Sequence, residues 1–568
     1  MRGPSALILL AGLTWSATFL PEPEAKIYPY RWVRLNVGLS KDADLEQVRQ
    51  IARTASEHGL NGILLSAGLD QLDLKPADFR TRLAEVKRVC EENKLDIIPA
   101  IFSTGYGGSL LAHDKNLAEG LPVKDALFVV EGQEARLVAD PPVAIANGGF
   151  EEASADRLGG FDLSGTFSQL AVLDDQVKKA GRTALLLQNF QTQPEGTIRL
   201  SQWVTVHPYR SYRLSCWVKA ESLESTDPFG EGFFQLEVFG GEEKRKLQWE
   251  NPKPTPGTEW RQVAVGFNSW GYDRVLIAPA VTGGANGKFW IDDLQLDEVA
   301  LVNVLRRPGA PLQVRGEKSG RTYEEGRDFA PVADPAMNSR YDHPGPTIRL
   351  VAGTRMKDGE RLRVSFYHPV SIYNGQTPVC MSEPKVYEIW KTQARLIHEA
   401  LAPQHYFLNA DEQRAAGTCK ACADRHLTLG EIMGDCVTRA FNLIRDVNPK
   451  ADVAVWSDML DPNHNAGNRK KYYYLTSGNF YGSWNHVPKD LIIGCWYYER
   501  RDASLKHFSS LGFRTIAGAY YDADDLQNPR DWLKSMDATP GAMGIIYTTW
   551  LDKYALLGDF GDLVSKRK

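Results

Sequence analysis

Two adjacent carboxylates, Asp411 and Glu412, follow a short apolar run at 406–408. The run has the length and composition of a buried strand, and the loop after the pair contains Gly417. In a barrel of parallel strands the catalytic groups lie at the C-terminal ends of the strands. The alternative is that the pair caps the following helix, because acidic residues are favoured at helix N-termini. The pair is therefore a candidate for acid–base chemistry.

The rest of the chain supplies the strands that such a barrel needs. Amphipathic helices are expected at 44–58, 76–93, 386–401 and 427–447, and their alternation with apolar segments is typical of a parallel sheet with helical crossovers. Eight apolar segments match the number in a closed (β/α)8 barrel. The count holds if segment 361–366 is not a barrel strand; if it is one, a later segment is not. The expected strand centres are Trp32, Gly62, Ile97, Tyr406, Ala454, Ile492, Ile516 and Ile545.

The alternation breaks after the third expected strand. A glycine-rich loop at 105–108 leads, beyond about Val123, into a long stretch of short alternating segments separated by turn residues. This pattern is typical of a β-sandwich. The most distinctive segments of the stretch are 147–151, 181–185, 212–219 and 289–294.

In this order the four segments resemble the jelly-roll carbohydrate-binding modules of the families 4, 9, 16 and 22 group, over about 143–298. The resemblance implies glycan binding and a structural calcium ion, for which Glu151 and Asp292 are candidate ligands. The two acids could instead serve as turn caps. Candidate sugar-stacking residues, each of which could also fill the core, are Trp203, Trp249, Trp260 and Trp270.

These patterns together predict an α/β protein, a (β/α)8 TIM barrel interrupted after strand 3 by an inserted jelly-roll β-sandwich. The predicted parts are a signal peptide at 1–25, the first part of the barrel at 26–130, the sandwich at 131–300, a β-rich connector at 301–370 and the second part of the barrel, with the catalytic residues, at 371–568.

Composition limits the classes of partner. The chain has 568 residues, of which 43% are hydrophobic and 24% charged, as in a soluble globular protein with a large core. Its 66 basic and 71 acidic residues leave a net charge of -5, which offers no electrostatic case for nucleic acid or an anionic membrane. The sequence contains no dinucleotide fingerprint, P-loop or HExxH motif, so no cofactor is expected for catalysis.

The N-terminus has the form of a secretory signal peptide. Arg2 precedes an apolar run at 6–17 that is too short to span a bilayer, and a stretch rich in Pro and Glu follows at 21–24. We therefore expect export to the periplasm or the extracellular space. No later stretch is long and apolar enough to predict a membrane span.

The chain has seven cysteines, which is a low number for a protein held together by disulfides and an odd number, so they cannot all pair. Cys419 and Cys422 form a C-x-x-C motif just after the carboxylate pair. A local disulfide that braces this loop is one interpretation. A zinc site is the other, with His426 and Cys436 as the nearby residues that could complete it. Haem attachment would need His at Ala423.

Aromatic and acidic residues end strands four to eight in a fixed order. They are Asp411, Glu412, Trp456, Trp496, Tyr520, Asp522, Trp550 and Asp552. This ordered set resembles glycoside hydrolase family 20, the β-N-acetylhexosaminidases, over about 387–552. The chain departs from the family at Asn409-Ala410, where two glycines are usual.

The resemblance implies substrate-assisted catalysis on a glycan, in which the 2-acetamido oxygen of the sugar attacks its own anomeric carbon. Glu412 would protonate the leaving oxygen and later deprotonate water. Asp411 would hold the acetamido N–H and stay ionised, which keeps Glu412 protonated because like charges repel. Tyr520 would donate to the acetamido oxygen.

The remaining residues of the set are implied to bind the sugar. Asp522 and Asp552 would bind hydroxyl groups, and Arg34 or Arg31 would fill the role of the family's sugar-binding arginine. Tyr367 and His368, at the end of an expected strand at 361–368, are further candidates for substrate binding. The tryptophans implied to wall the pocket are Trp456, Trp496 and Trp550.

Two alternatives have different chemistry. In a retaining glycosidase that acts on non-acetylated sugars, Glu499 or Asp458 would attack the sugar while Glu412 acts as the acid. In a non-catalytic carbohydrate-binding protein, the barrel would serve as a scaffold only.

Overall fold

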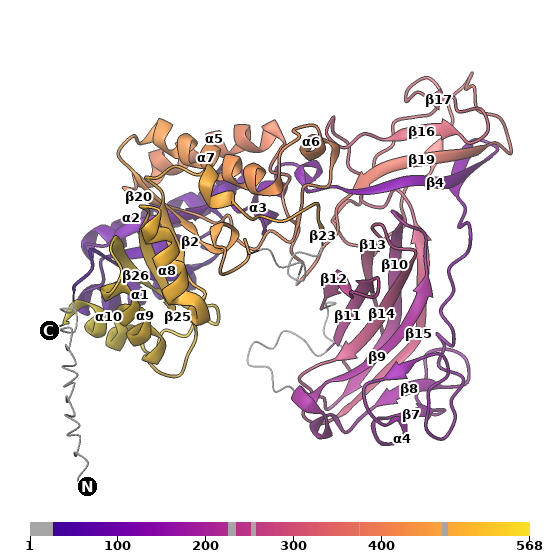
Figure 1. The fold of residues 1–568 in the computed structure, drawn as a ribbon, viewed down its shortest axis with the longest axis horizontal. Coiled ribbons are helices and arrows are strands. Elements are labelled where there is room, and N and C mark those ends of the chain that lie inside the picture. The colour runs from indigo at the N-terminus through magenta and orange to yellow at the C-terminus, as the bar shows by residue number, and fades with distance from the viewer. Residues whose placement is uncertain (1–25, 225–233, 252–256, 374, 468–474, 568) are drawn as a thin grey trace, which may run out of the picture.

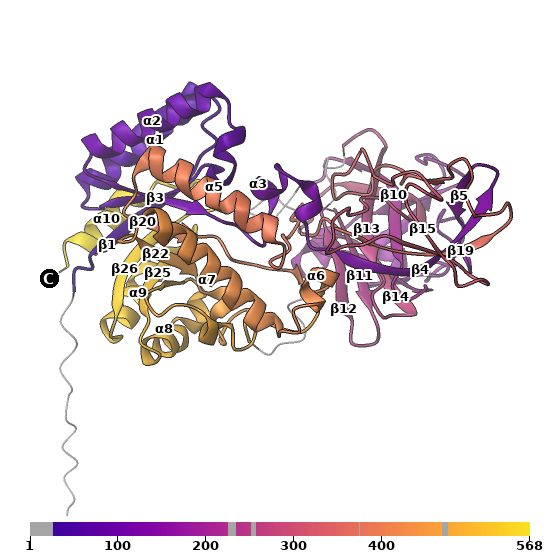
Figure 2. The ribbon, with the colours of Figure 1, turned by 90° about the horizontal axis from the view of Figure 1, so that it is seen from above.

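A closed parallel barrel of eight strands forms one lobe of the protein, as Figures 1 and 2 show. The computed structural model describes residues 26–224, 234–251, 257–373, 375–467 and 475–567, so the predicted signal peptide at 1–25 lies outside the described residues. Each of the eight expected strand centres lies in this barrel. In barrel order the strands are β1 (Tyr30–Asn36), β2 (Gly62–Ser66), β3 (Asp96–Ile101), β20 (His405–Leu408), β22 (Asp452–Trp456), β24 (Ile492–Cys495), β25 (Arg514–Tyr520) and β26 (Ala542–Thr548).

Alternation along the strands separates two apolar layers. Side chains such as Trp32, Leu64 and Phe407 fill the inside of the barrel. Their neighbours, for example Val33 and Leu65, point outward and pack under the helices. The larger helices are α1 (Asp42–Glu57), α2 (Ala77–Glu92), α5 (Pro384–Leu401), α7 (Leu429–Val447), α8 (Arg501–Ser510), α9 (Gln527–Asp537) and α10 (Leu557–Ser565).

The sequence marks where α7 begins. Thr428 accepts the backbone N–H of Glu431, and the Glu431 side chain accepts the N–H of Thr428, which makes a capping box. A face that includes Ile432, Cys436 and Ala440 is buried. Because α7 connects β20 to β22, it fixes the spacing of the two strands beside the acidic pair.

Between β3 and β20 the chain builds a six-stranded sheet. Segment 361–366 belongs to β19, which pairs antiparallel with β4 and is not a barrel strand. The boundary expected at 130 falls inside β4, because β4 continues the β-type pattern of this sheet. In sheet order the strands are β17 (Thr322–Tyr323), β16 (Gln313–Gly316), β19 (Arg361–His368), β4 (Leu121–Glu131), β5 (Glu134–Leu137) and β18 (Ile348–Arg349).

Two five-stranded sheets share one apolar core and form the second lobe with the six-stranded sheet (Figure 1). The first has the order β13 (Arg261–Asn268), β10 (Ser211–Glu221), β15 (Lys288–Val299), β8 (Ala184–Leu187), β7 (Ala171–Asp174). The second has the order β12 (Arg245–Glu250), β11 (Phe234–Gly240), β14 (Arg274–Val281), β9 (Ile198–Thr205), β6 (Asp162–Leu163).

The four expected sugar-stacking tryptophans are half-buried in this lobe. Cationic side chains already lie over three of the rings: Arg274 over Trp203, Lys246 over Trp249 and Arg245 over Trp270. Trp260 packs against a small apolar cluster.

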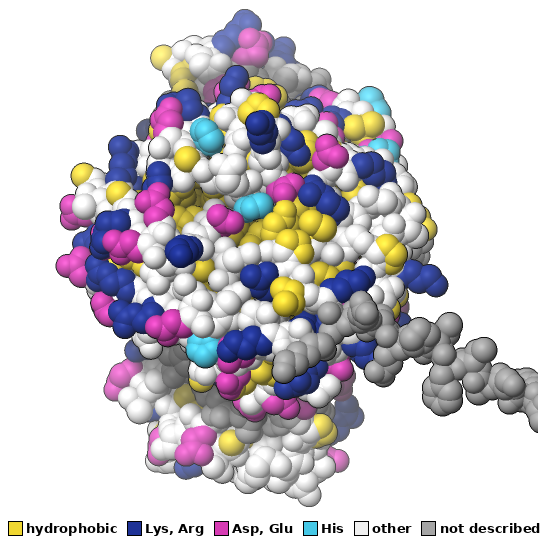
Figure 3. All heavy atoms as spheres, turned by 90° about the vertical axis from the view of Figure 1, so that its left-hand side faces the viewer, with side chains coloured by type: hydrophobic (Ala, Val, Ile, Leu, Met, Phe, Trp, Pro, Cys, Tyr) yellow, Lys and Arg dark blue, Asp and Glu magenta, His cyan; other side chains and the backbone are white. Residues whose placement is uncertain are grey.

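The surface of the barrel lobe carries both signs of charge. On the face that points away from the sheets, basic and acidic side chains are interspersed (Figure 3). Within the described ranges, no helix is both long and apolar enough to cross a membrane.

Candidate active site

A cavity of about 590 Å³ opens at the C-terminal ends of the barrel strands. Its size is within the range of about 300–1,000 Å³ that is typical of small-molecule sites. Asp411 and Glu412 both line it, together with aromatic side chains from several loops. The lining residues are Arg34, Ser66, Ser103, Tyr106, Tyr373, Asn409, Asp411, Glu412, Trp456, Trp496, Tyr521, Thr548 and Trp550.

The carboxylate of Glu412 is held from two sides. Tyr106 donates its hydroxyl to one oxygen, and a guanidinium nitrogen of Arg414 lies 3.0 Å from the other. The backbone of Glu412 has a φ of 48°, which is unusual for a residue other than Gly or Asn. Its N–H donates to Asp458 at 2.9 Å. A strained backbone and two side-chain partners thus fix the orientation of this acid.

Two fully buried acids, Asp411 and Asp458, lie next to Glu412. Burial, followed by the charge of Glu412, raises the pKa of Asp411 to about 7. Burial, followed by the charge of Asp411, raises the pKa of Asp458 to about 8. Asp411 is therefore only partly ionised at neutral pH in the free protein, whereas the sequence led us to expect an ionised Asp411. The physical reason is that Asp411 is fully buried beside the charge of Glu412, and the sequence does not reveal this burial.

The three tryptophans Trp456, Trp496 and Trp550 line the cavity, and their binding of sugar stays a prediction. Trp456 is buried and packs on Phe407 inside the barrel, with ring centres 4.4 Å apart. The ring of Trp496 lies parallel to that of Tyr521, with ring centres 6.2 Å apart. Trp550 is 44% exposed and stacks with Arg34, whose guanidinium carbon lies 4.0 Å from the ring centre. Flat apolar surfaces thus enclose the acidic pair.

The tyrosine that reaches the cavity is Tyr521, not Tyr520. Tyr520 is 2% exposed and stacks on Tyr547, with ring centres 4.1 Å apart. Tyr520, Tyr521 and Asp522 all have positive φ, so the chain turns sharply at the end of β25 and presents the next side chain. The expectation for Tyr520 is corrected by one residue.

Asp522 supports the wall instead of lining the cavity. Its carboxylate accepts the hydroxyl of Thr549 and the backbone N–H of Trp550, the latter at 2.7 Å. Asp552 has a φ of 54° and is not among the residues that line the cavity. The two acids were expected to bind sugar hydroxyls, but the structure places Asp522 behind Trp550.

Of the two candidate arginines, Arg34 lines the cavity. It donates to the carbonyl of Thr549 at 2.9 Å. Arg31 instead donates to the carbonyls of Tyr28 and Gly59. Alternation along β1 thus separates two arginines that the sequence does not distinguish.

Tyr367 and His368 do not lie at the cavity. Both belong to β19 in the six-stranded sheet, and neither is among the lining residues. His368 is buried and hydrogen-bonded with Tyr341 and Asn268. They were expected to bind substrate because they lie at the end of an expected strand, but this strand pairs with β4 and β16 in the six-stranded sheet.

The two alternative nucleophiles also lie outside the lining. Asp458 is buried behind the acidic pair, where it accepts from Glu412 and from Asn465, each at 2.9 Å. Glu499 is exposed in the short helical turn Tyr498–Arg500. Among the described lining residues, Asp411 and Glu412 are the two acids.

Sequence analysis missed Tyr106 and Tyr373 as lining residues and Arg414 as a partner of Glu412. One signal for Tyr106 was present in the glycine-rich loop. A Cβ atom at Gly105 would lie 2.2 Å from the carbonyl oxygen of Asp411, so only glycine lets this loop reach the acidic pair. Tyr373 comes from a segment far away in the sequence and carries no comparable signal.

Glu151, which lies before β6, and Asp292, which lies in β15, both accept hydrogen bonds from backbone amides. Glu151 accepts the N–H of Arg182 at 2.7 Å, and Asp292 accepts those of Lys179 and Ala180 at 2.8 and 2.9 Å. These contacts hold one segment, 179–182, between β7 and β8. Calcium at these residues stays a prediction.

Comparison with known proteins identifies no family: no family model matches the chain, and no curated protein does. Among solved structures, a glycoside hydrolase family 20 β-N-acetylglucosaminidase is 9% identical, covers 95% of this chain and 69% of its own, and has a TM-score of 0.35. A rhamnosidase from Novosphingobium sp. PP1Y is 10% identical, with coverages of 92% and 55% and a TM-score of 0.33. A family 4 carbohydrate-binding module is 14% identical, with coverages of 27% and 99% and a TM-score of 0.20. These TM-scores are low, so function has to be inferred from the cavity itself.

Proposed function

We propose that the chain is a glycoside hydrolase and that the cavity around Asp411 and Glu412 is its active site. The observation that carries this proposal is an adjacent acid pair enclosed by tryptophan and tyrosine rings at the C-terminal end of a parallel barrel. Flat rings stack on the apolar faces of sugars, and glycoside hydrolysis needs carboxyl groups beside the scissile bond. The N-terminal pattern further supports export to the periplasm or the extracellular space.

The mechanism that we propose is that of a retaining, exo-acting β-N-acetylhexosaminidase. The acetamido oxygen of the substrate attacks its own anomeric carbon while Glu412 gives a proton to the leaving oxygen, and an oxazolinium ion forms. Glu412 then takes a proton from water, whose oxygen attacks the anomeric carbon and reopens the ring. Tyr106 and Arg414 hold Glu412 in place for both steps.

Asp411 would accept the acetamido N–H in this scheme. The positive charge of the oxazolinium ion favours the ionised carboxylate, which offsets the burial that raises the pKa of Asp411 to about 7. Tyr521 takes the donor role expected of Tyr520, because its side chain reaches the cavity. The substrate supplies the nucleophile, which fits a cavity whose described lining contains no third acid.

The deciding experiment measures hydrolysis of 4-nitrophenyl β-glycosides of GlcNAc, GalNAc, glucose and galactose. We expect activity on the N-acetyl sugars only, and a loss of about 10²- to 10⁴-fold in Glu412→Gln. Glu499→Gln, at an exposed acid outside the cavity, is the matched control and should keep wild-type activity. A thiazoline mimic of the oxazolinium ion should inhibit tightly.

Two outcomes would overturn parts of this proposal. Hydrolysis of the plain hexosides would exclude the acetamido group as the nucleophile and leave Asp411 as the other acid among the described lining residues. Binding of the sugars without hydrolysis of any glycoside would favour a carbohydrate-binding protein.

A further inference from the structure

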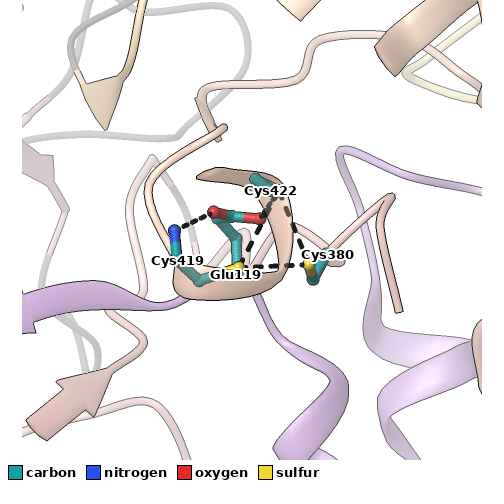
Figure 4. Close-up of side chains that lie close together, drawn as sticks. All are labelled: Glu119, Cys380, Cys419 and Cys422. Carbon is teal, nitrogen blue, oxygen red and sulfur yellow. Dashed lines mark hydrogen bonds between the residues drawn. The ribbon is translucent and has the colours of Figure 1, made fainter. Parts of the chain in front are cut away.

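Four buried side chains from distant parts of the chain converge next to the loop that follows the acidic pair. Glu119 precedes β4, Cys380 precedes α5, and Cys419 and Cys422 belong to the start of the short helix α6 (Lys420–Ala423). Figure 4 shows the three sulfur-bearing side chains around the Glu119 carboxylate. We call these four residues the thiol cluster.

The sulfur atoms are too far apart for disulfides and well spaced for a shared metal ion. The Sγ atoms of Cys380 and Cys419 lie 3.4 Å apart, and Cys422 Sγ lies 3.8 Å from each of them. A disulfide has an S–S length of about 2.05 Å. Tetrahedral coordination with metal–sulfur bonds of about 2.3 Å places sulfurs about 3.8 Å apart.

Glu119 is oriented as a single-oxygen ligand. Its Oε1 accepts the backbone N–H and the hydroxyl of Thr418, both at 2.8 Å, and the N–H of Cys419 at 3.1 Å. Oε2 is left on the side of the thiols, 3.8 Å from Cys422 Sγ. Hydrogen bonds that hold a ligand from behind are characteristic of metal sites.

The charges of the cluster call for a cation. Glu119 is buried, and the nearby Arg307 is already paired with Glu383 and donates to the carbonyl of Ala118 at 3.0 Å. Arg307 lies close to Glu119 and Cys419, but it is shared with Glu383, so it offsets only part of the cost of burying a carboxylate and thiolates. A divalent ion that binds all four ligands would offset this cost.

We propose that Glu119, Cys380, Cys419 and Cys422 bind one structural Zn²⁺ ion. Thiolates in a tetrahedral set favour zinc over calcium or magnesium, which prefer oxygen ligands. Four protein ligands leave no open position, so the ion stabilises the fold and takes no part in the chemistry. The proposal does not depend on the glycosidase function.

Of the two interpretations of the C-x-x-C motif, this assignment keeps the zinc site but changes two of its ligands. All seven cysteines are free thiols in the structure, so Cys419 and Cys422 form no disulfide there. The partners are not His426, which is exposed, or Cys436, which lies in α7. They are Cys380 and Glu119, which the fold brings in from earlier parts of the chain.

The ion would fasten the loop under the acidic pair. Next to the cluster, Gln413 donates to the carbonyl of Val379 at 3.2 Å, and Gln376 donates to the carbonyl of Glu412 at 2.9 Å. A metal that links Cys380 to Cys419 would therefore join the segments before α5 and after Glu412 at a further point, in addition to these hydrogen bonds. Loss of the ion should loosen the loop and lower thermal stability.

The test is the metal content of the intact purified protein, measured by elemental mass spectrometry. We expect about one zinc per chain, and thiolate-to-cobalt charge-transfer bands when cobalt replaces zinc. Cys380→Ala should lose the ion, whereas Cys90→Ala, a buried cysteine on α2, should keep it. Thr418→Val, which removes one hydrogen bond to Glu119, should weaken zinc binding by about 10- to 100-fold.

Three results would overturn the assignment: a wild-type protein without bound metal and without a cobalt spectrum, a different metal at the same stoichiometry, or a disulfide between two of the three cysteines in peptide mapping. If Cys380→Ala fails to fold, cobalt titration of chelator-treated wild type still decides. None of these readouts uses a substrate, so failure of the zinc site and failure of the glycosidase proposal can be told apart.

Discussion

The side chain of Asp458 accepts the backbone N–H of Glu412 at 2.9 Å, so a buried acid on the loop after β22 supports the backbone of an acid on the loop after β20. Asn465 donates to the same oxygen at 2.9 Å. The position of Glu412 therefore depends on a neighbouring strand as well as on its own.

Asp458→Asn should change how stability depends on pH. Burial raises the pKa of Asp458 to about 8 in the folded protein, above the value of about 4 for an unfolded chain. The folded state thus binds the proton more tightly, and the stability from this group is full below about pH 4 and lost as pH rises through about 8. The melting temperature of Asp458→Asn minus that of wild type should therefore increase from pH 6 to pH 9. In a chain of this length, 1 kcal/mol of unfolding free energy corresponds to about 2–4 °C or less.

Asp446→Asn, at an exposed acid on α7, is the control for the Asp458 variant and should follow the wild-type pH profile. Equal pH dependence in Asp458→Asn and wild type would show that Asp458 keeps no extra proton in the folded state.

Activity should fall on the acidic side of neutrality. The pKa of Asp411 is raised to about 7, so the group is increasingly protonated below this pH and then lacks the negative charge that would stabilise the oxazolinium ion. We expect kcat/KM on an N-acetyl glycoside to fall about tenfold per pH unit below about 7. The residual activity of Asp411→Asn should lack this limb. An unchanged limb in the variant would assign it to another group.

Two neighbouring tyrosines offer a paired test of the site. Tyr521→Phe removes a hydroxyl from the cavity wall and should lower kcat/KM by about 10²- to 10³-fold if this hydroxyl stabilises the developing oxazolinium ion. Tyr520→Phe, in the core beside Tyr547, should affect stability more than kcat. The reverse pattern would restore the role that the sequence indicates for Tyr520.

Gly105→Ala should damage the site, while Gly108→Ala should not. A Cβ atom at Gly105 would lie 2.2 Å from the Asp411 carbonyl, whereas one at Gly108 would meet nothing within 4 Å. Overpacking of this kind costs about 1–3 kcal/mol, so the first variant should melt earlier and hydrolyse more slowly. Comparison of the two by calorimetry and by assay checks this. Wild-type melting temperature and activity in Gly105→Ala would show that the loop 105–108, which carries Tyr106, can move away from the acidic pair.

The barrel could be predicted from the sequence because each strand is a short apolar run between turn residues or helices. The ends of the strands were harder to predict. A shift of one residue at the end of β25 exchanges Tyr520 for Tyr521, and three consecutive positive φ angles, which no sequence pattern marks, set this shift. The thiol cluster could not be predicted from the sequence either. Glu119 and Cys419 are 300 residues apart, and only the folded chain brings them into contact.

The two chain segments that connect the lobes run side by side where they leave and rejoin the barrel. Ala118 and Val379 form an antiparallel bridge, and the N–H of Cys380 donates to the carbonyl of Leu117 at 2.9 Å. With respect to the barrel, the chain between Ala118 and Val379 is one long insertion whose two ends are paired with each other. Each doubling of the length of such a loop costs only about 0.6 kcal/mol of loop-closure entropy. The barrel can therefore carry this long insertion at a small cost in loop-closure entropy, and Tyr373 and Gln376 on the returning segment help to complete the site.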